Sequence, residues 1–367
     1  MRASVLSAGG AMAIESLEMP IPRIKEVLVR VVACGVCHTD LHVIKGEVKF
    51  PTPCVLGHEI SGVIEQVGPG AVGVAIGDRV ACSFIMPCGT CRHCVRGLED
   101  LCEAFFSHNR LNGVLYDGET RLARRGGEPI AMYSMGGLAE YCVVPDTDVF
   151  VLPEAISTAE AAVLGCSVFT SLGAVKNVAK LAVGETVAVV AVGGIGLNIV
   201  QMAVAFGAKQ VIAIDINDEK LKLAADLGAT HVVNSRTIDP VERVRELTGG
   251  RGVDVAFEAL GSASTVETAI HLVDDGGRVV LVGIAPAGVT AGLDVTHVVR
   301  RKIQILGSYG ARARTDMPTV LNLVASGSID VKSLITDRFP LEQAAEAYAL
   351  LSAGKIIGRA VIDIQPT

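Results

Sequence analysis

The sequence predicts an α/β protein in which a doubly wound parallel sheet is combined with a second, β-rich domain. Residues 1 to about 160 contain short β-rich segments that glycine and proline separate, with little helical periodicity. From about residue 167, apolar runs alternate with amphipathic stretches, which is typical of a parallel sheet with helices on both faces. The 367 residues are enough for two domains of ordinary size.

Composition excludes several classes of protein. Half of the residues are apolar and 19% are charged, which excludes intrinsic disorder. Lysine and arginine total 32 against 39 for aspartate and glutamate, and this balance argues against a nucleic-acid partner or an anionic membrane surface. Residues 186–208 carry no charge, but they include several glycines, so we expect a buried strand, a turn and a helix there and no membrane span.

The N-terminus and the cysteines indicate a cytoplasmic protein. Arg2 is the one basic residue before two glutamates, so no signal peptide is predicted. Ten cysteines in such a chain favour metal ligation over disulfides.

The strands are expected in this order. In the β-rich domain the clearest segments are residues 27–32, 62–67 and 79–82. Residues 107–137 are polar and rich in arginine and glycine, and we expect them to form a surface excursion. In the second half, strands are expected at residues 187–192, 210–214, 231–233, 253–258, 278–283 and 303–306, with helices between most of them, for example at 218–227 and 240–247. The last 60 or so residues return to mixed character, and we expect them to rejoin the first domain.

The first strand of the parallel sheet leads through glycines into a helix, as in dinucleotide-binding sites. A helix N-terminus reached in this way presents free N–H groups to a pyrophosphate. In the turn formed by Gly193, Gly194, Ile195 and Gly196, the first glycine lets the backbone approach the phosphates and the last allows close helix packing. The usual first glycine of G-x-G-x-x-G is Ala191 here, and we expect it to strain or reshape the turn.

An acidic residue follows at the end of the next strand. Asp215 lies 19 residues beyond Gly196, where a carboxylate accepts hydrogen bonds from the adenosine ribose and repels a 2′-phosphate, which favours NAD over NADP. The alternative is that Asp215 only caps the helix that begins near Asn217. Lys220, one turn into that helix, either contacts the same ribose or is an ordinary exposed lysine.

Four cysteines form a compact metal-binding motif. Cys88, Cys91, Cys94 and Cys102 lie within 15 residues, at spacings that can close tetrahedrally around one zinc ion. A site with four protein ligands has no open position, so its role is to fold the lobe of residues 83–103. An iron–sulfur cluster is the alternative, but its bacterial spacing differs and places proline after the fourth cysteine.

A second group of metal-ligand types is scattered along the chain. Cys37, His58 and Cys166 would together give two thiolates and one imidazole, three protein ligands with one open position, as in a catalytic zinc site. Each residue taken alone is more simply explained by core packing, and sequence spacing does not bring the three together.

Taken together, these segments resemble the zinc-dependent, medium-chain alcohol dehydrogenases. The resemblance is carried by residues 35–40, 57–59, 88–102, 165–166 and 192–196 and by Asp215. It implies a GroES-like catalytic domain in two parts, residues 1–166 and 309–367, with a Rossmann domain at 167–308 inserted between them. It also implies two zinc ions per chain, NAD as cofactor, and Cys37, His58 and Cys166 as the catalytic ligands.

The resemblance implies a proton pathway as well. Zinc would act as a Lewis acid that makes a bound alcohol more acidic, so that its hydride passes to the nicotinamide. Thr39 would hydrogen-bond the reacting oxygen and pass its proton through the ribose to His42 near solvent. Asp40 would orient a zinc ligand, and Glu59 would be either an outer partner or an alternative ligand.

Further coenzyme contacts follow from family position. His38 and Arg359 would contact the pyrophosphate, the histidine standing where the family often has arginine. Thr170 would lie behind the nicotinamide ring, and Val282, Gly283 and Ile284 would flank its carboxamide.

The expected pocket is mostly apolar. Its side chains would be Phe84, Met132, Tyr133, Ile284 and Tyr309, which favours a primary aliphatic or aromatic alcohol and its aldehyde, although Arg110, Arg312 and Arg314 could reach the entrance. The alternatives are a polyol dehydrogenase, against which Cys166 counts, a hydroxy-acid or semialdehyde dehydrogenase, and a non-catalytic zinc- and NAD-binding protein. A homodimer or a homotetramer is expected.

Overall fold

The computed structural model describes residues 1–365 and divides them into two compact units. The first unit consists of residues 1–169, 312–325 and the segment that begins at Val331. The second comprises residues 170–311 and 326–330. The boundaries between the two units, at 169/170 and 311/312, fall slightly later than the predicted starts at 167 and 309. The sequence did not predict that residues 326–330 would belong to the second unit.

Two sheets form the first unit. The larger has the order β10-β6-β5-β3-β18-β17, with β9 also paired to β3, and the smaller has the order β2-β1-β4-β8-β7. The larger sheet contains β3 (Glu26–Val36), β5 (Ile60–Val67), β6 (Arg79–Cys82), β9 (Tyr141–Pro145), β10 (Val149–Val151), β17 (Ile335–Pro340) and β18 (Arg359–Asp363). The smaller contains β1 (Arg2–Leu6), β2 (Met12–Ser16), β4 (Cys54–Val55), β7 (Leu122–Ala123) and β8 (Pro129–Met132).

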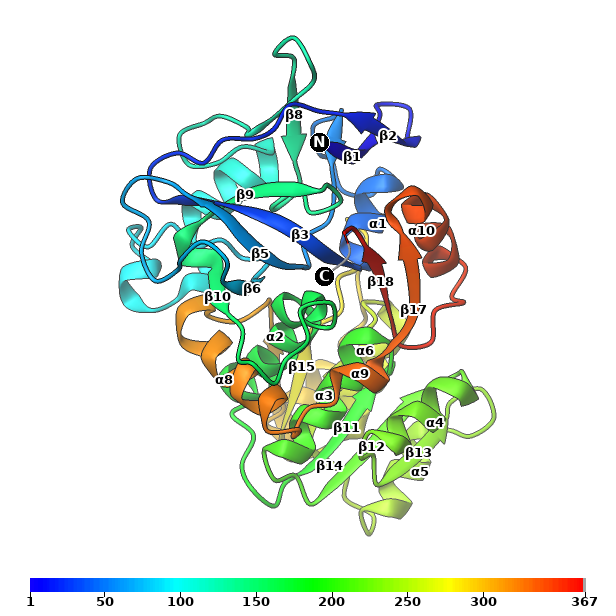
Figure 1. The fold of residues 1–367 in the computed structure, drawn as a ribbon. Helices are drawn as coiled ribbons and strands as arrows, with labels where there is room; N and C mark the ends of the chain where they lie inside the picture. Colours follow the sequence, from blue (N-terminus) through cyan, green and yellow to red (C-terminus); the bar gives the residue numbers. More distant parts are fainter. Residues whose placement is uncertain (366–367) are drawn as a thin grey trace. The chain divides into compact units, whose positions relative to one another are not determined.

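The C-terminal segment completes the larger sheet. Strand β18 pairs antiparallel with β3, so that Ala360 lies opposite Val36. Figure 1 shows this pairing as a dark red strand beside a blue one. The expectation that the last part of the chain rejoins the β-rich domain is therefore confirmed. The helices of this unit are α1 (His38–Ile44), α8 (Ala313–Ala325), α9 (Val331–Leu334) and α10 (Ala344–Ser352), and α2 (Ser167–Leu172) runs across the division.

Residues 107–137 form the predicted surface excursion only in part: residues 111–112, 117–119 and 125–129 are exposed, and the others are partly or fully buried apart from exposed residue 107. They contain β7 and β8, and β8 pairs in parallel with β4. Leu122, Ile130 and Met132 are buried, and the guanidinium of Arg121 is paired with buried Glu26. The buried part was not predicted because strands this short show no clear alternation, and because an arginine with a carboxylate partner can be buried.

The second unit contains one parallel sheet in the order β13-β12-β11-β14-β15-β16. Counted within the unit, this is the order 3-2-1-4-5-6 of the Rossmann fold. The strands are β11 (Thr186–Val190), β12 (Gln210–Asp215), β13 (His231–Asn234), β14 (Val253–Glu258), β15 (Val273–Leu281) and β16 (Gln304–Gly307). All six predicted strands are present.

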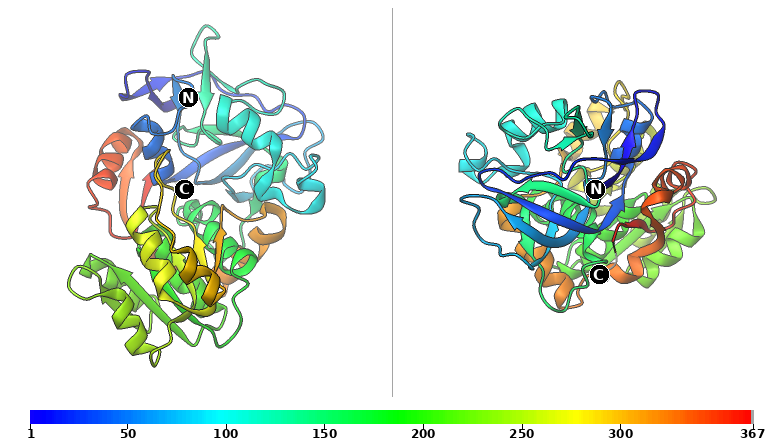
Figure 2. Two further views of the ribbon diagram at one scale, coloured as in Figure 1. Left: turned by 180° about the vertical axis from the view of Figure 1, so that it is seen from behind. Right: turned by 45° about the horizontal axis from the view of Figure 1, so that its top comes forward.

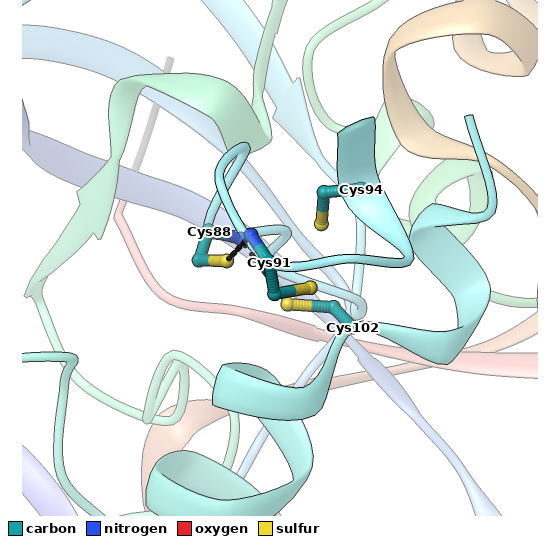
Figure 3. A group of neighbouring side chains, drawn as sticks. All are labelled: Cys88, Cys91, Cys94 and Cys102. Atoms are coloured by element: carbon teal, nitrogen blue, oxygen red, sulfur yellow. Dashed lines mark hydrogen bonds between the residues drawn. The ribbon is translucent and has the colours of Figure 1, made fainter. Parts of the chain in front are cut away.

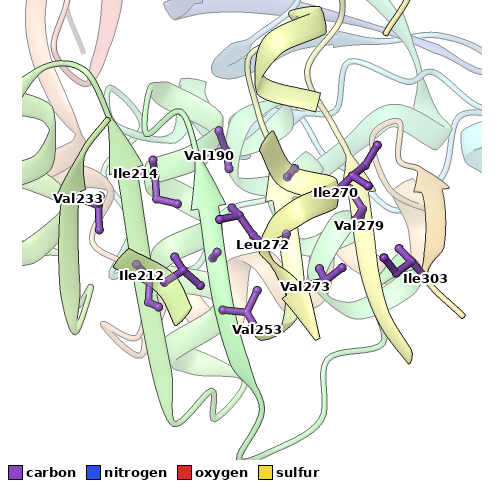
Figure 4. Packing of buried hydrophobic residues seen from close by; sticks show 14 residues of the cluster. Val190, Ile212, Ile214, Val233, Val253, Ile270, Leu272, Val273, Val279 and Ile303 are labelled. Carbon is purple, nitrogen blue, oxygen red and sulfur yellow. The ribbon is translucent and has the colours of Figure 1, made fainter. Parts of the chain in front are cut away.

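Helices cover both faces of this sheet. Figure 4 shows the core on one face, where Ala188, Val190 and Ile212 belong to a cluster of buried apolar side chains. The cluster also takes in residues of α5 (Pro240–Leu247) and α6 (Ala263–Leu272), and Val298 of α7 (Val295–Arg301) packs against it. The other helices are α3 (Gly194–Ala205) and α4 (Asp218–Asp226), which contact each other. Seen from behind, the yellow helices α6 and α7 lie in front of the sheet (Figure 2).

The uncharged stretch at 186–208 is a strand, a turn and a helix, as predicted. It consists of β11, the glycine turn and α3, and its residues are mostly buried. Across residues 1–365, none of the helices has the length and apolar character needed to cross a membrane.

Candidate active site and metal centres

The structure brings together the scattered ligand types. One ligand atom each of Cys37, His58, Glu59 and Cys166 lies within 4.8 Å of the others, and all four residues are buried. Cys37 follows β3 and is the N-cap residue of α1, His58 and Glu59 precede β5, and Cys166 follows a 3₁₀ turn at Ala161–Gly165. Sequence spacing does not predict this convergence, because it depends on how the strands of the first unit pair.

A glycine makes room for the carboxylate of this group. Gly35 lies on β3, and its backbone N–H donates to the carbonyl of Glu59. A Cβ atom at position 35 would lie 2.1 Å from Oε2 of Glu59, closer than any real contact. Any larger residue at Gly35 would therefore displace Glu59 from the metal-ligand group.

Asp40 contacts the imidazole of the group, as the resemblance implied. Its Oδ2 lies 3.0 Å from Nδ1 of His58, and both side chains are fully buried. Its Oδ1 accepts a hydrogen bond of 3.1 Å from the backbone N–H of Gly57. With Asp40 at Nδ1, the other ring nitrogen of His58 is left for a metal.

The protonation of the group can be described residue by residue. A hydrogen bond from Cys166 lowers the pKa of Cys37 well below its ordinary range, and nearby His58 lowers it further. Burial lowers the pKa of His58, but the charges of Asp40 and Cys37 outweigh burial and raise it to about 10. Within residues 1–365, neither buried ring nitrogen of His58 makes a hydrogen bond, although Nδ1 lies 3.0 Å from Oδ2 of Asp40. Two sulfurs, one imidazole nitrogen and an adjacent carboxylate are a donor set that zinc accepts, so these residues fit the ion.

Arg359 lies in a different setting from the one expected. It was predicted to contact a pyrophosphate, but its side chain is 6% exposed and its guanidinium pairs with Glu59. The pairing follows from the position of β18 beside β3, because Arg359 is the first residue of β18. Glu59 therefore contacts both the ligand group and a buried cation, which sequence analysis missed because the two residues lie 300 positions apart.

The residues of the expected proton pathway lie on helix α1. The thiol of Cys37 donates to Oγ1 of Thr39 over 3.6 Å. His42 is partly exposed, and its Nδ1 pairs with the carboxylate of Glu47, a partner that was not predicted. The backbone N–H of Glu47 also donates to the carbonyl of His42, which fixes the pair locally. His38, expected near a pyrophosphate, is exposed at the start of the helix.

The four-cysteine lobe has the geometry of a metal site (Figure 3). The sulfurs of Cys88, Cys91, Cys94 and Cys102 all lie within 4.8 Å of one another. Backbone N–H groups point at them: Cys91 donates to Cys88 and Cys88 donates to Cys102, each over 3.3 Å. Partial burial raises the pKa of Cys91, but backbone hydrogen bonds outweigh burial and lower it to about 6. Burial raises the pKa of Cys102, so the case for a metal rests on the four neighbouring sulfurs, a donor set that zinc accepts.

The lobe is fastened to the rest of the first unit by a charged pair. Glu99, in a 3₁₀ turn at Glu99–Leu101, is buried and accepts a hydrogen bond of 2.8 Å from the backbone N–H of Arg314. The guanidinium of Arg314 pairs with the same carboxylate. Arg314, considered above as a residue at a pocket entrance, instead binds the lobe to α8.

The glycine turn has the form expected of a phosphate-binding loop. Helix α3 begins after Gly193, and no side chain caps the N–H groups of its first turn, which Gly194, Ile195 and Gly196 provide. A Cβ at Gly196 would lie 2.1 Å from the carbonyl oxygen of Ala191, whereas a Cβ at Gly193 would meet nothing within 4 Å. Ala191 adopts a φ of 70°, a left-handed conformation that costs a residue with a side chain, as the sequence predicts.

Asp215 ties the next strand to this turn. Its Oδ2 accepts from the N–H of Val192 at 2.9 Å, and its Oδ1 accepts from Ile216 and Asn217. A carboxylate has about four acceptor positions, so one remains for a ribose hydroxyl. The cap of α4 is Asn217, which accepts from the N–H of Glu219 and of Lys220, so Asp215 is not itself the helix cap.

The remaining predicted coenzyme residues also lie in the second unit. Thr170 and Val282 are buried, and Ile284 is 44% exposed just beyond the end of β15. The backbone N–H groups of Val282 and Gly283 both donate to the carbonyl of Glu258, which fixes this segment beside β14.

Aromatic rings surround the imidazole of the metal-ligand group. The rings of Phe84 and Tyr133 lie 6.0 and 6.2 Å from that of His58, and Phe50 packs edge-on against Tyr133 at 4.8 Å. The guanidinium of Arg110 lies over the Tyr133 ring, 4.4 Å from its centre. Met132 is buried nearby in sequence, and the other two expected pocket residues, Ile284 and Tyr309, belong to the second unit.

Comparison with known proteins decides the family. A family model described as an alcohol dehydrogenase GroES-like domain matches residues 23–154, and one described as a zinc-binding dehydrogenase matches residues 194–326. An NDMA-dependent alcohol dehydrogenase from Amycolatopsis methanolica is 37% identical over 97% of both chains. The chain belongs to the zinc-dependent medium-chain dehydrogenase family.

Solved structures agree with this assignment. An alcohol dehydrogenase zinc-binding domain protein from Burkholderia ambifaria is 34% identical, with a TM-score of 0.93 over 100% of this chain and 99% of its own. Benzyl alcohol dehydrogenase from Acinetobacter calcoaceticus is 31% identical, with a TM-score of 0.92 over 99% of both chains. The predicted fold class, a GroES-like domain with a Rossmann domain, is confirmed. The protein is a medium-chain dehydrogenase, an oxidoreductase of the alcohol dehydrogenase type.

Proposed function

We propose that this medium-chain dehydrogenase catalyses reversible, NAD-dependent oxidation of a primary aliphatic or aromatic alcohol to its aldehyde, with one catalytic and one structural zinc ion per chain. The observation that carries the proposal is the buried group formed by Cys37, His58 and Cys166, whose ligand atoms lie together with that of Glu59 within 4.8 Å. When bound, zinc there supplies a Lewis acid that acidifies a hydroxyl, and NAD supplies the hydride acceptor.

The chain's own residues would manage the proton. Thr39, beside Cys37, offers a hydroxyl that can take the proton of the alcohol and pass it on. Nδ1 of His42 is paired with the carboxylate of Glu47, which would keep a proton on that nitrogen. Nε2 would then be the ring nitrogen that exchanges a proton with water. Arg359 keeps Glu59 paired, so that the carboxylate beside the ligands is neutralised.

Coenzyme choice would depend on Asp215. Its carboxylate lies at the end of β12 and already binds the turn at Val192, which holds it where an adenosine ribose is expected. A 2′-phosphate would bring two more negative charges close to it, so NAD is favoured over NADP. Gly193, with open space around its Cβ position, would allow the pyrophosphate to approach the backbone.

The substrate class is supported by the rings around His58. Phe84 and Tyr133 would give an alcohol an apolar, aromatic environment, and the structural relative from Acinetobacter calcoaceticus is named for benzyl alcohol. The guanidinium of Arg110 lies over the Tyr133 ring, which makes an alcohol that also carries a carboxylate the second candidate.

Two further expectations stay proposals. A homodimer or homotetramer is supported by β16, which forms an edge of the Rossmann sheet and lies near exposed Val295 and Val299 of α7; light scattering would measure the mass. The cytoplasm is proposed as the place of action, on the cysteine argument given above.

The test is a steady-state assay of coenzyme reduction. NAD and NADP are offered in turn with ethanol, hexanol, benzyl alcohol, a polyol and 4-hydroxybutyrate, and NDMA is added as a further electron acceptor because one relative is named for it. We expect turnover with NAD and hexanol or benzyl alcohol, lost on zinc chelation. The variant Asp215→Ser should narrow the preference for NAD over NADP without moving the preference among alcohols.

Other outcomes would revise the proposal in defined ways. Turnover with the polyol or 4-hydroxybutyrate alone would overturn the substrate class and retain the chemistry. Equal rates with NADP would contradict the role of Asp215. A protein with two zinc ions that neither binds NAD nor reduces it would favour the non-catalytic alternative.

A further inference from the structure

A buried tyrosine, which the proposed mechanism does not use, contacts Asp40. Tyr348 lies on α10, its side chain is 2% exposed, and its hydroxyl donates a hydrogen bond of 3.0 Å to Oδ2 of Asp40. The two residues are 308 positions apart, and the packing of α10 against α1 brings them together. No sequence motif indicates this contact.

The hydroxyl of Tyr348 donates to the carboxylate oxygen of Asp40 that faces His58. Oδ2 of Asp40 accepts from Tyr348 and lies 3.0 Å from Nδ1 of His58, while Oδ1 accepts from the backbone N–H of Gly57. Both oxygens of this fully buried carboxylate are therefore held by fixed donors. Without Tyr348, Oδ2 would keep His58 as its partner and lose the contact that fixes its direction.

A purely structural role is the simpler alternative, and the molecule contains an example of it. A tyrosine hydroxyl that is removed from water needs an acceptor, because leaving it unpaired is costly. Partly buried Tyr116 meets this need with the backbone carbonyl of Met86, an acceptor that contacts no group of the Cys37 site among the described contacts. Tyr348 differs because its acceptor is the atom that contacts the imidazole of His58.

We propose that Tyr348 is a positioning residue of the Cys37–His58–Cys166 metal site, holding the Asp40 carboxylate so that His58 presents Nε2 to the ion. The inference rests on the zinc site of the proposed function. Outer partners of a metal-bound histidine typically change metal affinity by 10- to 100-fold, and the tyrosine acts through such a partner. Its loss should therefore affect metal retention at this site and leave the four-cysteine lobe unchanged.

The experiment compares zinc release from the wild-type holoprotein and from Tyr348→Phe, which removes one oxygen atom. Each full-length protein, loaded with zinc, is mixed with excess chelator, and the loss of the two ions is followed over time. Zinc release from the Cys37 site is identified as the kinetic phase that is absent in Cys37→Ser. We expect this phase to be about tenfold faster in Tyr348→Phe than in the wild type, and the phase from the four-cysteine lobe to be unchanged. When cobalt replaces zinc, the absorption of the ion at the Cys37 site should likewise be lost faster from Tyr348→Phe than from the wild type. Tyr116→Phe, which removes the hydroxyl of a partly buried tyrosine that donates to a backbone carbonyl, should leave the Cys37-site phase at the wild-type rate.

Each outcome decides between the alternatives. If Tyr348→Phe lowers the melting temperature but releases both ions at wild-type rates, Tyr348 is only structural and the inference is wrong, while the proposed function stands. If the wild-type protein holds zinc in the lobe alone, the proposed site and this inference fail together. If Tyr348→Phe does not fold, Asp40→Asn tests the same link from the other side, because wild-type release rates in that variant would also overturn the proposal.

Discussion

Ala191 carries a measurable strain at the point where the nucleotide-binding turn begins. Its left-handed φ of 70° costs a residue with a side chain about 1–2 kcal/mol, while glycine loses about 0.5–1 kcal/mol through its freer unfolded state. We therefore expect Ala191→Gly to stabilise the protein by up to about 1 kcal/mol and to raise Tm by about 2 °C.

A matched variant separates relief of strain from a general effect of glycine. Ala188, on β11 of the same sheet, has no left-handed backbone, so Ala188→Gly should lower Tm. Calorimetry of the three proteins makes the comparison. A lower Tm for Ala191→Gly as well would show that the turn holds alanine without strain.

The raised pKa of His58 makes zinc binding dependent on pH. Although burial lowers it, Asp40 and Cys37 raise this pKa to about 10, so at neutral pH the imidazole holds a proton that a metal must displace. Zinc affinity should therefore rise with pH, by about tenfold per unit below pH 10 for this one proton, and fall on acidification. Competition with a chelating dye at several pH values measures it. A zinc affinity that does not change with pH around neutrality would contradict the conclusion that His58 holds a proton there.

The residues of the site divide into those that the sequence predicts and those that it does not. Cys37, His58 and Cys166 were named because their types match zinc ligands and their surrounding residues match a family. Tyr348, Glu47 and the pairing of Arg359 with Glu59 were not predicted. Two of these contacts join residues about 300 positions apart, and they depend on β18 and α10 packing against the first part of the chain.

Among the elements, the four-cysteine lobe depends most on a single ion. Its residues form only short turns, and its four sulfurs lie within 4.8 Å of one another. We expect Cys94→Ala to reduce bound zinc from about two ions per chain to about one and to make residues 88–102 sensitive to proteases, because such loops fold around their metal.

A control cysteine completes that test. Cys54 is buried on β4 outside both metal-ligand groups, so Cys54→Ala should keep both ions. Zinc analysis with limited proteolysis gives both readouts. A Cys94→Ala protein that keeps two ions and resists proteolysis would show that the lobe does not need its metal.

Elements were predictable where one pattern covers their whole length. The six strands of the Rossmann sheet are apolar runs separated by amphipathic helices, so each was found within about two residues of its observed bounds, except that β15 begins at Val273 and not at residue 278. Strands β7 and β8 were missed because they are short and their segment is rich in arginine and glycine. The lobe was predicted because its ligands lie within 15 residues, a distance over which spacing determines geometry.

At the scale of the whole molecule, the two units contain different groups of candidate functional residues. The first unit holds both metal-ligand groups, and the second holds the glycine turn and Asp215. Family membership is shown by matches over both units, whereas the metal, the coenzyme and the alcohol are proposals that need the loaded protein.

The most direct test of the central claim measures zinc content and NADH formation on the same samples of wild-type protein and Cys37→Ser. We expect about two zinc ions per chain and turnover of a primary alcohol with NAD for the wild type. For Cys37→Ser we expect about one zinc ion and a rate at least about 100-fold lower, since even outer partners of a metal ligand change activity by 10- to 100-fold. Undiminished turnover by Cys37→Ser would contradict the claim that this group holds the catalytic metal.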